Sequence, residues 1–156
     1  MHAEEDADTI KQFVIARTPN NWISGDKYLR GADRRYWIPG RSDIRGILSK
    51  CRVAHQGSQG DVFDCDDYAY VLKSRMSFLG LESRGITGGL PIAFGIYWGR
   101  ASWAPDPLHA GNWFVTREND LVWIEPQFNN AEAIAAGKAP IRPGTDSVTH
   151  LELMAF

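Results

Sequence analysis

The spacing of apolar residues changes near the middle of the chain, and this change predicts the fold class. Apolar residues recur every three or four positions, the period of an amphipathic helix, in three early segments: 6–17, 42–48 and 65–79. Later they form short runs between turn residues, which is typical of strands: 91–99, 109–116, 121–127 and 148–156. Helices followed by antiparallel strands predict an α+β fold, with the helices packed on one side of a sheet.

Two further local predictions concern helix ends. We expect the third helix to end at Gly80, because glycine is preferred just past a helix C-terminus. A short helix is also expected over 129–136, within the less regular part of the second half.

Length, composition and charge restrict the class of protein. A chain of 156 residues fits a single domain, 1–156. The formal net charge is -2, and no basic stripe is available for phosphates, which argues against a nucleic-acid partner. No apolar run approaches the ~20 residues of a membrane-spanning helix. The acidic start lacks the apolar region of a secretory signal, so a cytoplasmic protein is the default, with non-classical export left open.

The segment Asp64-Cys65-Asp66-Asp67 places a thiol at the start of the third predicted helix. Asp64 is a strong N-cap residue, which puts Cys65 at the first helical position. The positive end of the helix dipole favours a thiolate there, whereas the neighbouring aspartates oppose it. The other cysteine, Cys51, is interpreted as a buried thiol at a helix end, and two cysteines do not make a disulfide framework.

His109 and Glu125 supply plausible partners for this thiol. They flank a hairpin centred near 118–119, so both lie at the same open end of the ribbon. A carboxylate there could accept the Nδ1–H of His109 and fix its tautomer. Each residue alone has an ordinary structural interpretation, but the order Cys, His, carboxylate predicts a nucleophile, a base and an orienting group.

A thiol nucleophile also needs donors for the oxyanion that forms when it attacks a carbonyl. The helix N-terminal amide at Cys65 can supply one donor. Gln59, six residues earlier in a Gly/Gln/Ser loop, is the preferred second donor, with Gln56 and Gln127 as competing candidates.

At these residues the sequence resembles the papain-like (clan CA) cysteine peptidases. More narrowly, segments 64–69, 109–113 and 125–127 resemble the calcium-dependent protease domain of fungal chimerolectins of the Marasmius oreades agglutinin type. Bacterial transglutaminase-like cysteine peptidases are similar around the cysteine motif. The resemblance covers about 59–127, and because no β-trefoil lectin domain precedes this part, it does not imply glycan targeting.

The resemblance implies a papain-like/transglutaminase-like fold in which Cys65 is the nucleophile, His109 the base and Glu125 the orienting residue. It also implies activation by a divalent cation, expected to be Ca²⁺, which accounts for the excess of aspartates around the cysteine.

Asp66 and Asp67 are the expected metal ligands, with Asp61 or Asp64 as additional candidates, because hard cations prefer several oxygen ligands. A zinc site built on Cys65 and His109 is disfavoured, since no paired zinc-ligand motif accompanies them.

Three functions remain open. The favoured one is a thiol hydrolase, a cysteine peptidase that cleaves peptide or amide bonds of a protein or peptide substrate. The second is acyl transfer by the same residues, as in a transglutaminase or deamidase. The third is a non-catalytic metal-binding interaction module. Substrate identity and oligomeric state are not legible in the sequence.

Overall fold

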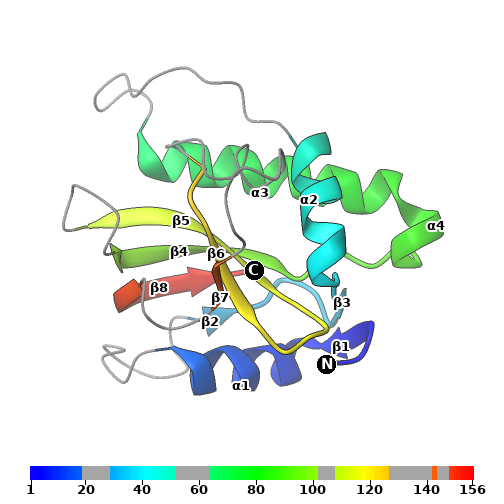
Figure 1. The fold of residues 1–156 in the computed structure, drawn as a ribbon, viewed down its shortest axis with the longest axis horizontal. Helices are drawn as coiled ribbons and strands as arrows, with labels where there is room; N and C mark the ends of the chain where they lie inside the picture. Colours follow the sequence, from blue (N-terminus) through cyan, green and yellow to red (C-terminus); the bar gives the residue numbers. More distant parts are fainter. Residues whose placement is uncertain (19–28, 52–63, 102–107, 127–141, 144–147) are drawn as a thin grey trace.

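The computed structural model describes residues 1–18, 29–51, 64–101, 108–126, 142–143 and 148–156 (Figure 1). Its helices are α1 (Ala7–Arg17), α2 (Arg41–Lys50), α3 (Cys65–Glu82) and α4 (Arg84–Thr87). Its strands are β1 (Glu4–Asp6), β2 (Leu29–Arg30), β3 (Arg35–Trp37), β4 (Phe94–Ala101), β5 (His109–Val115), β6 (Leu121–Ile124), β7 (Arg142–Pro143) and β8 (Val148–Ala155).

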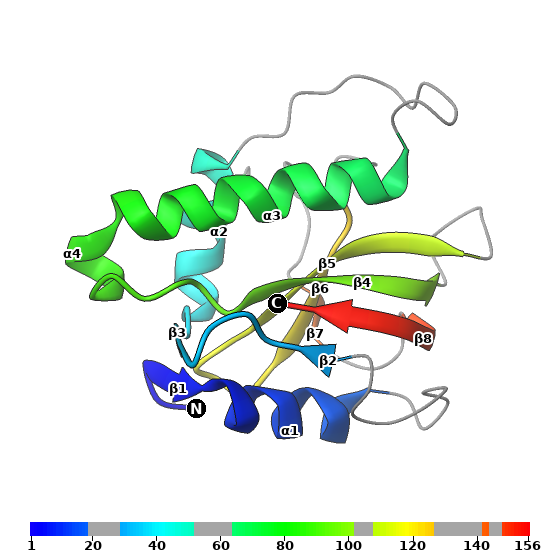
Figure 2. The same cartoon turned by 180° about the vertical axis from the view of Figure 1, so that it is seen from behind.

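The main sheet has six strands in the order β2-β8-β4-β5-β6-β7. Its pairs are antiparallel except β2–β8, which is parallel, and β1 and β3 form a separate antiparallel pair. In both Figure 1 and Figure 2, α3 lies along one face of the sheet and α1 lies beyond the other face. The sheet is therefore the middle of three layers.

Two separate apolar cores account for these layers. Alternate residues of the central strands point to opposite faces of a sheet. Phe94, Phe114 and Val122 pack with residues of α2 and α3 on one face. Tyr97 and Trp123 pack with residues of α1 on the other. The strands β5 and β6 are buried along their whole length, so their near-continuous apolar sequence reflects cover on both faces.

The predicted arrangement of the fold therefore needs correction. The papain-like/transglutaminase-like prediction put the helices on one side of an antiparallel sheet, but α1 covers the opposite face from α3. The physical reason is that β5 and β6 carry large apolar side chains on both faces, and both faces must be covered. The pair β1–β3 and the parallel contact of β2 with β8 were also not predicted.

The predicted ends of individual helices can be compared with the structure one by one. Helix α1 runs from Ala7 to Arg17, which agrees with the predicted range 6–17, and Asp6 is its N-cap. Helix α3, however, continues through Gly80 to Glu82. Gly80 is buried within the helix, and a Cβ there would lie 3.6 Å from the carbonyl oxygen of Leu90, which is an ordinary contact distance. The helix predicted over 129–136 lies outside the described residues.

The side chains of Asn112 and Lys73 help to tie α3 to the sheet. The buried amide of Asn112 on β5 donates to the carbonyl of Ala69 in α3, at 3.0 Å, and to that of Gly95 in β4, at 3.2 Å. From the helix, Lys73 Nζ donates to the Phe94 carbonyl at 2.7 Å. These bonds fix the helix relative to β4 and β5.

Within the described part of the chain, no helix is long and apolar enough to cross a membrane.

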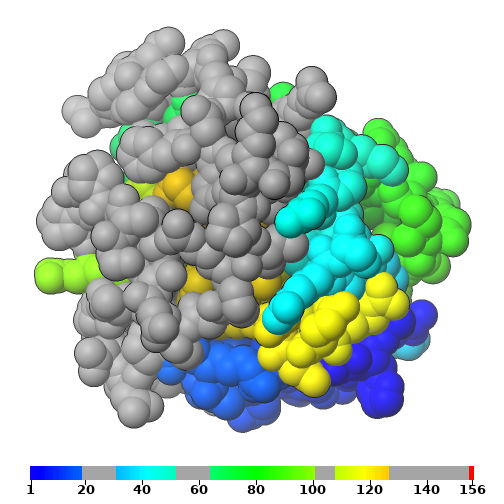
Figure 3. All heavy atoms as spheres, in the orientation of Figure 1, coloured from blue at the N-terminus to red at the C-terminus, as the bar shows by residue number. Residues whose placement is uncertain are grey.

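The turn between β5 and β6 is fixed to α2 by two ion pairs. Arg41 contacts Asp120 at 2.6 Å, and Arg117 contacts Asp43 at 2.7 Å. Figure 3 shows the cyan side chains of α2 beside the yellow turn. Exposed ion pairs of this kind contribute about 1 kcal/mol or less each, so their main consequence is to orient α2 against the hairpin.

Candidate functional site

The start of α3 presents a thiol. Asp64 has the extended backbone of an N-cap, and its side chain accepts from the amide of Asp66 at 3.3 Å. The side chain of Asp67 accepts in return from the amide of Asp64, at 3.2 Å, which completes a capping box. Cys65 is therefore the first helical residue, as predicted, and its side chain is partly exposed.

The register of β5 and β6 places His109 and Glu125 on one face. Asn112 lies opposite Ile124, so Gly111 lies opposite Glu125 when the register is continued by one residue. His109 is two residues from Gly111 and points to the same face. His109 and Glu125 are therefore diagonal neighbours across the two strands, a separation that long side chains can span.

His109 and Glu125 form a buried hydrogen-bonded pair through Nε2 and Oε2, with side-chain exposures of 2% and 3%. Burial lowers the pKa of His109, but hydrogen bonds to Cys65 and Glu125 more than offset this and raise the pKa from 6.5 to about 9. The Cys65 sulfur also accepts from the backbone N–H of Ala110 at 3.4 Å. The histidine is therefore protonated at neutral pH and contacts the thiol and the carboxylate together.

The predicted use of the histidine nitrogens was wrong in one detail. Glu125 contacts Nε2, not Nδ1. This leaves the other ring nitrogen for Cys65, with which the ring also shares a hydrogen bond. The predicted trio is otherwise brought together as expected from the hairpin geometry.

Tyr97 lies beneath this trio and was not predicted. It pairs with Gly111 across β4 and β5, and its ring packs on Trp123. Its hydroxyl is buried and has no hydrogen-bond partner among the described residues. Burial, together with the charges of Glu125 and Cys65, raises the pKa of Tyr97 well above its ordinary value. The sequence signal was Gly111, which leaves room for the Tyr97 ring.

Three carboxylates gather at the start of α3. Asp64, Asp66 and Asp67 each offer an oxygen within 4.8 Å of the others, and all three are partly exposed. A hydrogen bond to Asp64, burial and the neighbouring carboxylates raise the pKa of Asp66. The two predicted ligands, Asp66 and Asp67, are therefore joined by Asp64 in a set of oxygens that suits a hard cation.

Four sequence candidates lie outside the described residues: Gln56, Gln59, Asp61 and Gln127. The preferred oxyanion donor, Gln59, is among them, so its role stays a prediction.

The chain matches the family described as Agglutinin C-terminal over residues 36–131, which is more than half of its length. The chain belongs to this family. No curated protein matches at a significant level.

Two solved structures resemble the chain over 99% of its length. One is described as a PSL1a-E64 complex, at 20% identity and a TM-score of 0.69. The other is the Polyporus squamosus lectin bound to the human-type influenza-binding epitope Neu5Aca2-6Galb1-4GlcNAc, at 21% identity and a TM-score of 0.66. The chain spans about half of each of those chains, 51% and 50%. At this identity the likeness concerns the fold alone.

These comparisons correct the identification made from the sequence. They name an agglutinin family and lectin structures, not a peptidase. We therefore withdraw the assignment to the papain-like cysteine peptidases and with it the papain-like label for the fold. The assignments as a thiol hydrolase and as an enzyme, and the protein or peptide substrate, are withdrawn for the same reason. The grouping of Cys65, His109 and Glu125 rests on their contacts in the structure, and it does not depend on the papain-like assignment.

Proposed function

We propose that this chain is a ligand-binding module of an agglutinin-type protein, and that it holds its ligand at the site formed by Cys65, His109 and Glu125. Membership of the Agglutinin C-terminal family supports the type of protein. A partly exposed thiol in contact with a buried histidine, whose pKa is about 9, carries the proposal for the site.

The chemistry of the site follows from the charge on the histidine. An imidazolium beside a thiol favours the thiolate, and Glu125 in turn stabilises the imidazolium. A thiolate held this way captures an electrophilic ligand such as an epoxide. The sulfur forms a bond to one ring carbon, the carbon–oxygen bond breaks, and the oxygen takes the proton of the imidazolium.

The test is labelling with E-64, the compound named with one of the similar structures, followed by mass spectrometry. We expect one adduct on Cys65. Cys51 is the internal control, because burial raises the pKa of its thiol to about 11. His109→Gln should slow the labelling of Cys65 at least tenfold, the effect of losing ~1.4 kcal/mol. Labelling of Cys65 at the rate of Cys51, or unaffected by His109→Gln, would overturn the proposal.

A second candidate ligand is a glycan. Tyr70 on α3 and Trp98 on β4 hold their rings 5.7 Å apart, and Tyr70 is 52% exposed. Trp98 and Cys65 pack against the same small apolar cluster of Ala69, Ile96 and Ala110. An aromatic surface beside a few polar groups is typical of small-ligand sites. The glycan seen with the similar lectin therefore deserves testing on this chain.

Calorimetric titration with Neu5Aca2-6Galb1-4GlcNAc tests this candidate. Glycan binding at this site should be lost in Trp98→Ala and kept in Phe78→Ala, a matched change of an exposed aromatic farther along α3. Equal loss in both variants, or no binding by the wild type, would exclude the glycan. Steady cleavage of a protein substrate by the wild type but not by Cys65→Ala would contradict the binding-module proposal as a whole.

We further propose that Asp64, Asp66 and Asp67 bind Ca²⁺. Their oxygens form a compact set of the type that hard cations prefer. A bound cation would offset the repulsion among these carboxylates, which together with a hydrogen bond to Asp64 and burial raises the pKa of Asp66.

A further inference from the structure

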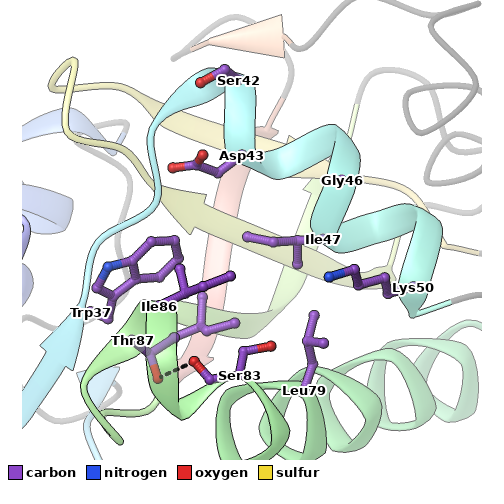
Figure 4. Close-up of a pocket in the computed structure, with 11 residues that line it drawn as sticks. Trp37, Ser42, Asp43, Gly46, Ile47, Lys50, Leu79, Ser83, Ile86 and Thr87 are labelled. Carbon is purple, nitrogen blue, oxygen red and sulfur yellow. Dashed lines mark hydrogen bonds between the residues drawn. The ribbon is translucent and has the colours of Figure 1, made fainter.

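A pocket lies at the opposite end of α3 from Cys65. This pocket of about 260 Å³ opens between α2, α4 and the C-terminal end of α3 (Figure 4). Leu79 lines it, and Leu79 is 14 positions after Cys65 along the helix, or ~21 Å at 1.5 Å per residue. The pocket is thus separate from the thiol site.

The pocket has an apolar interior. Four large side chains line it: Trp37, Ile47, Leu79 and Ile92 are each at most 9% exposed. Ile86, on α4, also lines the pocket and is 65% exposed. An exposed isoleucine at the opening of an apolar pocket leaves surface that a ligand would cover. A pocket of this volume suits a short aliphatic chain or one aromatic ring.

The two charged residues of the pocket differ in their pairing. Asp43 accepts from Arg117 at 2.7 Å and from the backbone N–H of Gly40 at 2.8 Å, so its charge is already compensated. Lys50 has no carboxylate within ion-pair distance among the residues that the structure describes. In Figure 4 its amine points toward Ile47 in the middle of the lining residues. The pocket therefore offers an apolar interior beside an exposed lysine that has no ion-pair partner among the described residues.

We infer that this pocket binds a small amphipathic carboxylate, with its apolar part against Trp37 and Ile92 and its carboxylate on Lys50. Charge complementarity selects a carboxylate over a neutral or cationic ligand, because Asp43 already has its own partner while Lys50 does not. The inference does not depend on the ligand proposed for Cys65.

Octanoate, with octanol as its neutral counterpart, is the probe for this pocket. Binding is followed through the backbone amide signals of the ¹⁵N-labelled protein. We expect saturable shifts at Ile47, Ile86 and Thr87, and no shift at Cys65. Lys50→Gln should raise the dissociation constant of octanoate about tenfold, because one charge-assisted hydrogen bond is lost. The dissociation constant of octanol should not change.

A glycine in the pocket allows a blocking variant with a matched control. A Cβ at Gly46, which lines the pocket, or at Gly85, which does not, would meet nothing within 4 Å. Gly46→Leu should abolish octanoate binding, and Gly85→Leu should keep it, with neither lowering the unfolding temperature. Absence of saturable shifts, equal binding of octanol and octanoate, or full binding by Lys50→Gln would each overturn the inference.

Discussion

Gly111 lies directly opposite Tyr97 in the β4–β5 pair, and the absence of a side chain at Gly111 is what lets the Tyr97 ring lie beneath the thiol site. A Cβ on Gly111 would come within 2.7 Å of Tyr97 Cε1 and 2.9 Å of its hydroxyl oxygen. On the other neighbouring strand, β6, the register continued by one residue places Glu125 opposite Gly111. Gly111 therefore makes room for the Tyr97 ring.

Gly111→Ala should destabilise the protein by about 1–3 kcal/mol, the usual cost of overpacking a filled core. The measurement is urea unfolding, compared with Gly46→Ala, where an added Cβ meets nothing within 4 Å. Gly46→Ala should leave stability equal or higher by up to ~1 kcal/mol. If the clash is with Tyr97, adding Tyr97→Leu to Gly111→Ala should cost less than the sum of the single changes; strict additivity would contradict this explanation.

The His109–Glu125 pair should make stability fall as pH rises. Folding raises the pKa of His109 from 6.5 to about 9, so the folded state binds the proton more tightly than the unfolded state. The resulting stability, on the order of 3 kcal/mol, is complete below pH 6.5 and is lost as pH rises through 9.

Urea unfolding of the wild type and of His109→Gln at pH 6, 7.5 and 9 checks this slope. Lys73 acts in the opposite direction, because burial lowers its pKa to about 8 and stability should rise between pH 8 and 10.5. The contribution of His109 is therefore taken as the difference between the two proteins. A difference that does not shrink between pH 6 and pH 9 would contradict the raised pKa of His109.

Loss of the Asn112 amide should lower stability and also slow the labelling of Cys65, although Asn112 does not contact the thiol. Asn112→Leu removes the donors to the carbonyls of Ala69 and Gly95, which should cost about 1–3 kcal/mol of stability. Because those bonds hold α3 against the sheet, E-64 labelling of Cys65 should also slow. Lys73→Met removes a different bond between α3 and the sheet together with a buried charge, and should change stability less. Unchanged labelling in Asn112→Leu would show that the amide only stabilises the core.

Calcium should stabilise the wild type through the carboxylates at the start of α3. Binding to the folded state alone raises stability by about 2.7 kcal/mol at a hundredfold excess over the dissociation constant. Asp66→Asn should reduce this gain strongly while leaving the cap intact, because the side chains that form the capping box are those of Asp64 and Asp67. Thermal unfolding with and without millimolar Ca²⁺ is the measurement. A gain that persists in Asp66→Asn would place the cation elsewhere.

The sequence determined the local elements and the chemistry that they carry. The N-cap Asp64 located the start of α3, because capping depends on neighbouring residues alone. The turn at 117–120 placed His109 and Glu125 at one end of a hairpin, because a hairpin fixes its own register. Hence the grouping of Cys65, His109 and Glu125 could be predicted.

Only the tertiary structure decided what covers each face and what lies between the elements. A strand that is apolar on both faces does not say which helix covers which face, so the position of α1 was missed. Gly80 was mistaken for a helix end because glycine is common just past a helix C-terminus, whereas α3 continues to Glu82. The Tyr97 ring beneath the site and the pocket at Lys50 likewise arise where segments separated in sequence meet. Spacing along the chain specifies contacts within an element or a hairpin, whereas contacts between layers depend on how complementary shapes and volumes fill a shared core.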